Sequence, residues 1–223
     1  MLAPSSLQFL KQLQKNNSKE WFDKNRKTYE LLKLDFASLV NNMIKEFGKK
    51  DPSISHLMAK DCVFRINRDV RFSKNKDPYK TNMGASINSG GKKAMTAGYY
   101  FHFEPGGKSF VGGGLYMAEP DKIKKVRQEI DYNWTDFKKI LDNKKFKQQY
   151  NNLDLSEGMS LVREPKGYEK DNPAIQYIKL KSWIAMTPIS DKMLTEKTLV
   201  KSISQAFEAL QPMIVFLNRA LED

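Results

Sequence analysis

The 223-residue sequence predicts an α+β fold, with an antiparallel sheet built mainly from the middle of the chain and flanked by N-terminal and C-terminal helices. Apolar residues recur at three- and four-residue steps over the first fifty residues and again after about position 120, which is typical of helices. Between positions 62 and 117 the pattern changes to short aromatic runs separated by glycine turns, which indicates strands. No repeat, low-complexity segment or linker interrupts the chain, so we expect a single α+β domain over residues 1–223.

Two helices are expected at the N-terminus. The first contains LQFLKQLQKN, in which leucines recur every three residues. The second begins near NNSKEWF, where Asn17 or Ser18 can cap it, and its apolar stripe continues to Phe47. Gly48 follows directly and is a typical helix end.

The strands of the sheet are expected in the middle of the chain. CVFRI opens the first, and GYYFHFE and SFVGGGLYM flank PGGK as a hairpin with a four-residue loop. If 62–72 is one straight strand, its even-numbered residues and its odd-numbered residues lie on opposite faces. Arg68 then falls among the apolar residues, so either the strand bulges near Asn67–Asp69 or Arg68 is buried and paired. The apolar face would hold Cys62, Phe64, Ile66, Val70 and Phe72, and the polar face Arg65, Asn67, Asp69 and Arg71.

The remainder of the chain returns to helical patterns. Helices are expected from Pro120 to about Tyr150, SWIAMTP reads as one more strand, and a final helix starts near Thr195. Pro212 falls inside that last helix and is expected to kink or break it.

The composition favours a basic cytoplasmic protein without a metal site or cofactor. The formal net charge is +12, which favours polyanionic partners through its general field. The N-terminus lacks a secretory pattern and no apolar run is long enough to span a bilayer, so no membrane contact is expected. The single cysteine, Cys62, fits a reducing compartment, and with only two histidines a structural zinc site is not expected. The oligomeric state is left open.

Arginine is concentrated in one short stretch of a chain that otherwise uses lysine. Three of the seven arginines lie between positions 65 and 71, and residues 49–93 carry eleven basic and four acidic side chains. An arginine in a lysine-rich chain suggests a use for its planar, bidentate fork. We therefore predict an anion-binding site, to which a second basic loop can contribute two more cations. Its residues would be Arg65, Arg68, Asp69, Arg71, Lys76, Tyr79 and Lys80, with Arg163 and Lys166 from the second loop.

The sequence gives weaker support for other binding or catalytic sites. PGGKSFVGGG lacks the first glycine of a phosphate-binding loop and is followed by a strand rather than a helix, which favours a hairpin turn. His102 shares a predicted strand face with Tyr100 and Glu104, and is either an acid or base or a satisfied sheet histidine. The arginines themselves have an alternative interpretation as a buried salt-bridge network.

The arginine stretch also carries a family resemblance. The segment from Arg65 to Tyr79 matches the pattern Arg, two residues, Arg-Asp, one residue, Arg-Phe, two residues, Asp or Asn, Lys, two residues, Tyr. This pattern resembles the signature of the mostly bacterial domain-of-unknown-function family 2461. The resemblance extends over NNSKEWFDKNR, YYFHFEPGG, GGGLYMAEP and LVREPKGYEKDNP. The resemblance implies that this stretch is functionally important, but it does not identify a reaction.

Three functions remain open from the sequence. The first is a binding module for a phosphate-bearing anionic ligand, with nucleic acid as the leading case. The second is an enzyme acting on a phosphorylated or carboxylated small molecule, with Asp69, His102 or Glu104 transferring protons. The third is an interaction or scaffold protein whose arginines are structural.

Overall fold

The computed structural model describes residues 1–222, and the chain divides into two compact units. The first unit contains Met1–Lys92, Tyr100–Val111 and Pro188–Gln205. The second contains Lys93–Tyr99, Gly112–Thr187 and the residues from Ala206 onward. The chain therefore passes between the units several times, and each unit is described by itself below.

The fold class is α+β, as predicted, with one antiparallel sheet in the strand order β1-β2-β3-β4. The strands are β1 (Met83–Ile87), β2 (Gly98–Phe103), β3 (Ser109–Leu115) and β4 (Trp183–Ile189). The predicted hairpin is confirmed as β2 and β3, and the predicted SWIAMTP strand is confirmed as β4. Strand β1 was not predicted, because its glycine, alanine and serine are poor strand formers.

The expected strand at 62–72 is wrong. Helix α4 (Ala59–Cys62) ends there, and the following residues form only isolated bridges, Val63 with Ala85 and Asn67 with Tyr79. The start of the segment pairs with β1 and the chain that leads into it, and within residues 1–222 its charged far end pairs with no strand. The alternating pattern also gave a wrong face for Phe72, which is 97% exposed.

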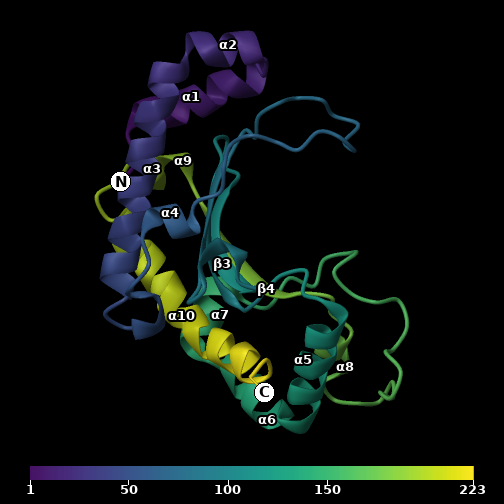
Figure 1. Ribbon diagram of the computed structural model, residues 1–223. Helices are drawn as coiled ribbons and strands as arrows, with labels where there is room; N and C mark the ends of the chain where they lie inside the picture. The colour runs from purple at the N-terminus through teal and green to yellow at the C-terminus, as the bar shows by residue number, and fades with distance from the viewer. Residues whose placement is uncertain (223) are drawn as a thin grey trace. The chain divides into compact units, whose positions relative to one another are not determined.

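The N-terminal helices of the first unit pack beside one another (Figure 1). They are α1 (Pro4–Lys15), α2 (Lys19–Lys24) and α3 (Arg26–Phe47). The predicted cap is confirmed at Ser18, whose hydroxyl accepts a hydrogen bond from the Trp21 amide at 3.2 Å. The expected single second helix is interrupted at Asn25, so it forms α2 and α3. The unit also contains the short helix η1 (Pro52–Ile54) and α9 (Asp191–Leu194).

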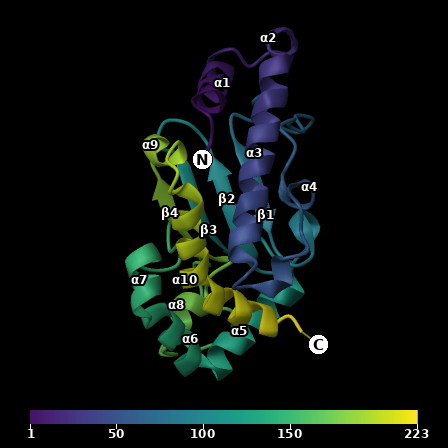
Figure 2. The same ribbon diagram turned by 90° about the vertical axis from the view of Figure 1, so that its left-hand side faces the viewer.

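Helix α3 covers one face of the sheet in the first unit (Figure 2). Phe36 of α3 stacks on Phe101 and Phe103 of β2, with ring centroids 6.0 and 6.2 Å apart. Because side chains alternate along a strand, Tyr100 and His102 point to the opposite face. The face of β2 that carries Phe101 and Phe103 therefore packs in the core, and the face that carries Tyr100 and His102 points away from α3.

The second unit is mostly helical. Its helices are α5 (Pro120–Tyr132), α6 (Trp134–Asp142), α7 (Lys144–Tyr150) and α8 (Ile175–Ile178), and η2 (Gly91–Lys93) lies where the chain enters it. Phe137 of α6 is fully buried, and its ring lies 4.9 Å from that of Phe216 and 5.7 Å from that of Tyr177. The predicted helices between Pro120 and Tyr150 are thus confirmed as three separate ones.

Helix α10 (Leu199–Arg219) continues through Pro212, so of the two expected outcomes, a kink or a break, the break is wrong. Proline removes one backbone donor, but Pro212 is on the exposed side of the helix, where water can satisfy the carbonyl that loses its partner. Over residues 1–222, no helix has both the length and the apolar character needed to cross a membrane.

Candidate functional site

The predicted arginine cluster lies on an irregular loop in the first unit, which we call the basic loop (residues 65–80). Its two limbs run antiparallel, with backbone hydrogen bonds from Arg68 to Pro78 at 2.9 Å and from Lys80 to Ile66 at 2.8 Å. It carries six cationic and two anionic side chains, a net charge of +4. Figure 1 shows this loop, in blue, extending away from the strands to which it connects.

The base of the loop is fixed to the N-terminal helices. The Asn17 amide donates to the Tyr79 carbonyl at 2.9 Å, and the Tyr79 amide donates back to the Asn17 side-chain oxygen at 3.2 Å. The Tyr79 ring stacks on Phe22 at 3.9 Å between centroids. Burial raises the pKa of Tyr79. Tyr79, which is among the residues predicted to bind an anion, is 6% exposed, and its contacts anchor the loop.

Arg68 holds the two limbs of the loop together. Its guanidinium donates to the Asp77 carbonyl at 3.0 Å and to the Ser73 hydroxyl at 3.2 Å. The side chain is half-buried, and both bonds are to groups of the same loop. Neither interpretation of Arg68 holds as stated, because the segment is not a strand and the side chain is only half-buried. Its partners are a carbonyl and a hydroxyl rather than a carboxylate.

Arg71 is paired with Asp69 near the tip of the loop. The guanidinium donates to both carboxylate oxygens, at 3.0 and 2.7 Å, and the Arg71 amide donates to the same carboxylate at 3.2 Å. These hydrogen bonds from the Arg71 side chain and backbone lower the pKa of Asp69. The Arg71 side chain remains 76% exposed. Asp69 thus orients an arginine that is still accessible to a ligand.

The rest of the loop presents cations and one aromatic ring to solvent. Arg65, Lys74 and Lys76 are exposed, and the Lys76 ammonium donates to the Val70 carbonyl at 3.1 Å. Phe72 lies between them in sequence, with the Arg71 guanidinium 5.9 Å from its ring.

Lys80 lies closer to the base of the loop, and its ammonium is 5.7 Å from the Phe64 ring. Burial lowers the pKa of Lys80, and the positive charge of Arg65 lowers it further. Arg65 and Lys80 therefore both contribute to a positive potential near the base of the loop.

The second predicted basic loop, with Arg163 and Lys166, belongs to the second unit. Both side chains are exposed, and Val162 beside them is 94% exposed. Lys179 donates to the Val162 carbonyl at 2.9 Å and pairs with Glu164 at 3.3 Å, which fixes the start of this loop within its unit.

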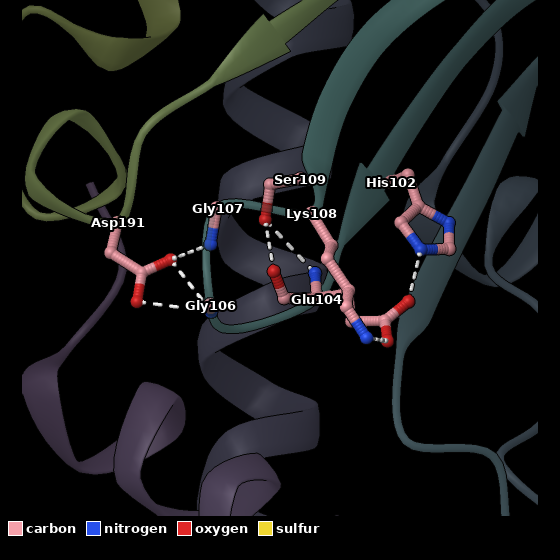
Figure 3. Close-up of polar contacts among 7 residues, drawn as sticks. All are labelled: His102, Glu104, Gly106, Gly107, Lys108, Ser109 and Asp191. Carbon is pink, nitrogen blue, oxygen red and sulfur yellow. Dashed lines mark hydrogen bonds and ion pairs between the residues drawn. The ribbon is translucent and has the colours of Figure 1, made fainter.

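A second group of polar side chains lies on the face of β2 opposite Phe101 and Phe103, and Figure 3 shows two of them, His102 and Glu104. One ring nitrogen of His102, Nε2, is 3.0 Å from a Glu104 carboxylate oxygen, and the other, Nδ1, is 3.4 Å from the Tyr100 hydroxyl. The imidazole stacks on Phe110 of β3 at 4.7 Å between centroids. The shared strand face predicted for these residues is thus correct, and they are in contact.

The glycine turn between β2 and β3 already binds an anion from its own chain (Figure 3). The amides of Gly106 and Gly107 donate to the Asp191 carboxylate at 3.1 Å, and Lys11 pairs with it at 3.1 Å. Although burial acts to raise the pKa of Asp191, the hydrogen bonds from these amides and Lys11 leave it lowered overall. This agrees with the sequence-based conclusion that PGGK is a turn and not a phosphate-binding loop.

Sequence reasoning missed the residues that act at long range. Asn17 was considered only as a helix cap and Asp191 was not considered, because nothing local connects either to its partner 62 or 85 residues away. The spacing of Tyr100, His102 and Glu104 at every second residue did carry a signal, since it is the period of a strand face.

We compared the chain with protein-family models, with curated proteins and with solved structures, and a family model matches it. The model of the family described as conserved hypothetical protein (DUF2461) matches residues 5–216. Searches of the curated proteins and of the solved structures gave no match. The match covers nearly the whole chain, including the basic loop, its anchor at Asn17 and the polar face of β2. The chain therefore belongs to the DUF2461 family of conserved hypothetical proteins.

Proposed function

We propose that the protein binds nucleic acid through the basic loop, with single-stranded segments as the preferred ligand. The observation that carries the proposal is the exposed aromatic ring of Phe72 among cations that face solvent. Cations beside an accessible aromatic ring suit a strand whose phosphates are neutralised while an unpaired base stacks on the ring.

The different positions of the arginines support this proposal, because one is bonded within the loop and two are exposed. Arg68 is used inside the loop, and Tyr79 anchors it, so the loop holds its shape without a ligand. A preorganised loop loses less conformational entropy on binding. Arg65 and Arg71 remain outward, and Arg71 keeps its fork oriented through Asp69. A purely structural role accounts for Arg68 but not for these two exposed arginines.

The exposed form of the loop distinguishes this function from binding of a small anion. A small phosphate or carboxylate ligand is usually enclosed, because its affinity depends on excluding water from a few charged contacts. Arg65, Arg71, Lys74 and Lys76 are all exposed instead. An extended polyanion can contact such dispersed cations one phosphate at a time, which a small ligand cannot.

The test is a fluorescence anisotropy titration of a labelled thymidine 20-mer and of a matched duplex at fixed low salt. We expect the wild type to bind the single strand more tightly than the duplex. Phe72→Ala should weaken single-strand binding by about 1–3 kcal/mol, or roughly 5- to 150-fold, while changing duplex binding little. Lys144→Ala removes an exposed lysine in the second unit and is the matched control, expected to bind like the wild type.

A second assay, with lipid vesicles, distinguishes binding of nucleic acid from binding to a membrane surface. Cations around an exposed phenylalanine can also contact anionic lipid headgroups. The same variants are therefore tested by co-sedimentation with phosphatidylcholine vesicles containing phosphatidylserine. Vesicle binding without oligonucleotide binding contradicts the proposal, as does oligonucleotide binding that is unchanged in Phe72→Ala.

A further inference from the structure

The polar group on β2 has the arrangement of a nucleophile, a base and an orienting carboxylate. Tyr100 and His102 of β2 alternate with Glu104, which follows the strand, and their contacts form a continuous chain from the phenol to the carboxylate. Figure 3 shows the part of this chain that joins His102 to Glu104. The His102 and Glu104 side chains are only 14% and 17% exposed. Partly buried ionisable groups need hydrogen-bond partners, and these two side chains supply them to each other.

The hydrogen bonds determine the direction in which a proton can move among Tyr100, His102 and Glu104. An ionised carboxylate can only accept, so Glu104 requires that the His102 Nε2 atom carry a proton. In a neutral imidazole the Nδ1 atom then has a free lone pair, which faces the Tyr100 hydroxyl. His102 is thus held in the form that can accept the phenol proton, and the Phe110 ring keeps its plane fixed. The 3.4 Å separation fits a catalytic contact that shortens when a substrate is bound.

The neighbouring strand leaves space for the phenol. A β-carbon at Gly84 of β1 would lie 2.4 Å from the Tyr100 hydroxyl oxygen, so the lack of a side chain at Gly84 leaves room for the phenol in this position. Strand β1 begins three residues after the basic loop ends at Lys80. Since β1 and β2 are antiparallel, the basic loop and Glu104 lie at the same end of these strands. The hydroxyl therefore lies next to the strand that connects directly to the basic loop.

We propose that Tyr100 is a nucleophile that attacks a phosphodiester, with His102 as its general base and Glu104 as the positioning residue. The substrate class rests on the proposed function, whereas the activation of Tyr100 does not. The phenol oxygen forms a bond to phosphorus as its proton moves to His102 Nδ1, and the bond from phosphorus to the leaving oxygen breaks. The products are a tyrosyl phosphodiester, an imidazolium paired with Glu104, and an alkoxide or phenolate that leaves with the bonding electrons.

The first experiment measures the reactivity of Tyr100 without any substrate. The native protein is treated with a limiting amount of an arylsulfonyl fluoride, which labels nucleophilic phenols, and the labelled tyrosines are mapped by mass spectrometry. Tyr132, which is 74% exposed, is the internal reference for an unactivated phenol. We expect Tyr100 to react at least about tenfold faster than Tyr132, despite being more buried, because a general base assists it.

Two variants separate activation from a purely structural network. His102→Gln removes the base, and Tyr100 labelling should fall to or below that of Tyr132. In Glu104→Gln the amide can donate to Nε2, so the imidazole proton can move to Nδ1 and His102 no longer accepts from the phenol. Nitrogen-15 spectra resolve this change, because the protein has only two histidines and His56→Gln leaves one. Faster labelling of Tyr132 than of Tyr100 in the wild type, or an unchanged ratio in His102→Gln, overturns the proposal.

The second experiment tests the substrate class. Bis(p-nitrophenyl) phosphate carries a leaving group that departs without an acid, so attack by Tyr100 releases nitrophenolate and leaves an aryl phosphate on the protein. We expect release and the covalent adduct in the wild type and neither in Tyr100→Phe, while Tyr132→Phe behaves like the wild type. Selective labelling without nitrophenolate release overturns the phosphodiester assignment. Because neither experiment uses an oligonucleotide, a failure here is distinct from a failure of nucleic acid binding.

Discussion

The contrast between Arg68 and Arg71 gives the sharpest test of how the basic loop is built. Arg68→Lys keeps the charge, but one ammonium cannot reproduce the fork that reaches both the Asp77 carbonyl and the Ser73 hydroxyl. Loss of one or both bonds in this half-buried position is expected to cost about 1–2 kcal/mol of loop stability. Opening of the loop should therefore become roughly 5- to 30-fold more frequent.

Hydrogen exchange measures this opening at the amides of Arg68 and Lys80, which donate across the two limbs. We expect faster exchange at both in Arg68→Lys and no change in Arg71→Lys, because the Arg71 pair is exposed and bridges only two residues. In the oligonucleotide titration we expect the opposite, because Arg71→Lys should bind the oligonucleotide more weakly than Arg68→Lys does. The reasoning is refuted if Arg68→Lys abolishes binding while leaving the exchange of both amides unchanged, since Arg68 would then be a ligand contact.

Three further predictions concern the surroundings of the loop and the sheet. Asn17→Ala leaves the Tyr79 amide and carbonyl without their partner and should lower the free energy of unfolding by about 1–3 kcal/mol in urea titrations. An unchanged midpoint would show that the anchor at Asn17 is dispensable. The lowered pKa of Asp191 means that its contribution to stability is present above its ordinary range near pH 4 and is lost as the pH falls through the folded value. Asp191→Asn should therefore flatten the acid side of the curve of melting temperature against pH, and parallel curves for variant and wild type would contradict this. Burial raises the pKa of the Cys62 thiol to about 11, so a disulfide reagent at pH 8 should modify it only on unfolding, and rapid modification of the native protein would be inconsistent with that burial.

The parts of the fold that depend on local signals could be predicted from the sequence. The hairpin of β2 and β3 followed from aromatic runs on either side of PGGK, and Gly106 and Gly107 adopt the positive φ values that such a turn requires. The cap at Ser18 followed from residue type and position alone. These features are set by neighbouring residues, so one stretch of sequence is enough to recognise them.

The parts that depend on distant partners could not be predicted. Residues 62–72 alternate like a strand, but a strand also needs a neighbour along its whole length, and the far end of this segment meets none. Phe72 was placed on the apolar face of the expected strand for that reason, whereas its exposure is what makes the loop a candidate binding surface. Strand β1 was missed because Gly84 is a poor strand former in isolation, and its closeness to the Tyr100 hydroxyl of the next strand depends on the folded sheet.

Whether the candidate site binds an anion stays a prediction, and the structure shows only where its residues lie. The sequence pointed to the segment from Arg65 to Lys80, and all of these residues lie on one loop. It did not separate the side chains that build the loop from those that remain exposed, because the bonds made by Arg68 and Tyr79 depend on the folded backbone.

The salt dependence of single-strand binding tests the central claim most directly. Four exposed cations of the loop, Arg65, Arg71, Lys74 and Lys76, can each neutralise one phosphate. At about 0.7 counterions released per contact, the logarithm of the association constant should fall against the logarithm of salt concentration with a slope of about −3. Replacing Arg65, Lys74 and Lys76 with alanine should reduce the steepness by about two units, to a slope near −1. A wild-type slope near zero, or a slope unchanged in the triple variant, would contradict the account of the basic loop as the nucleic-acid-binding surface.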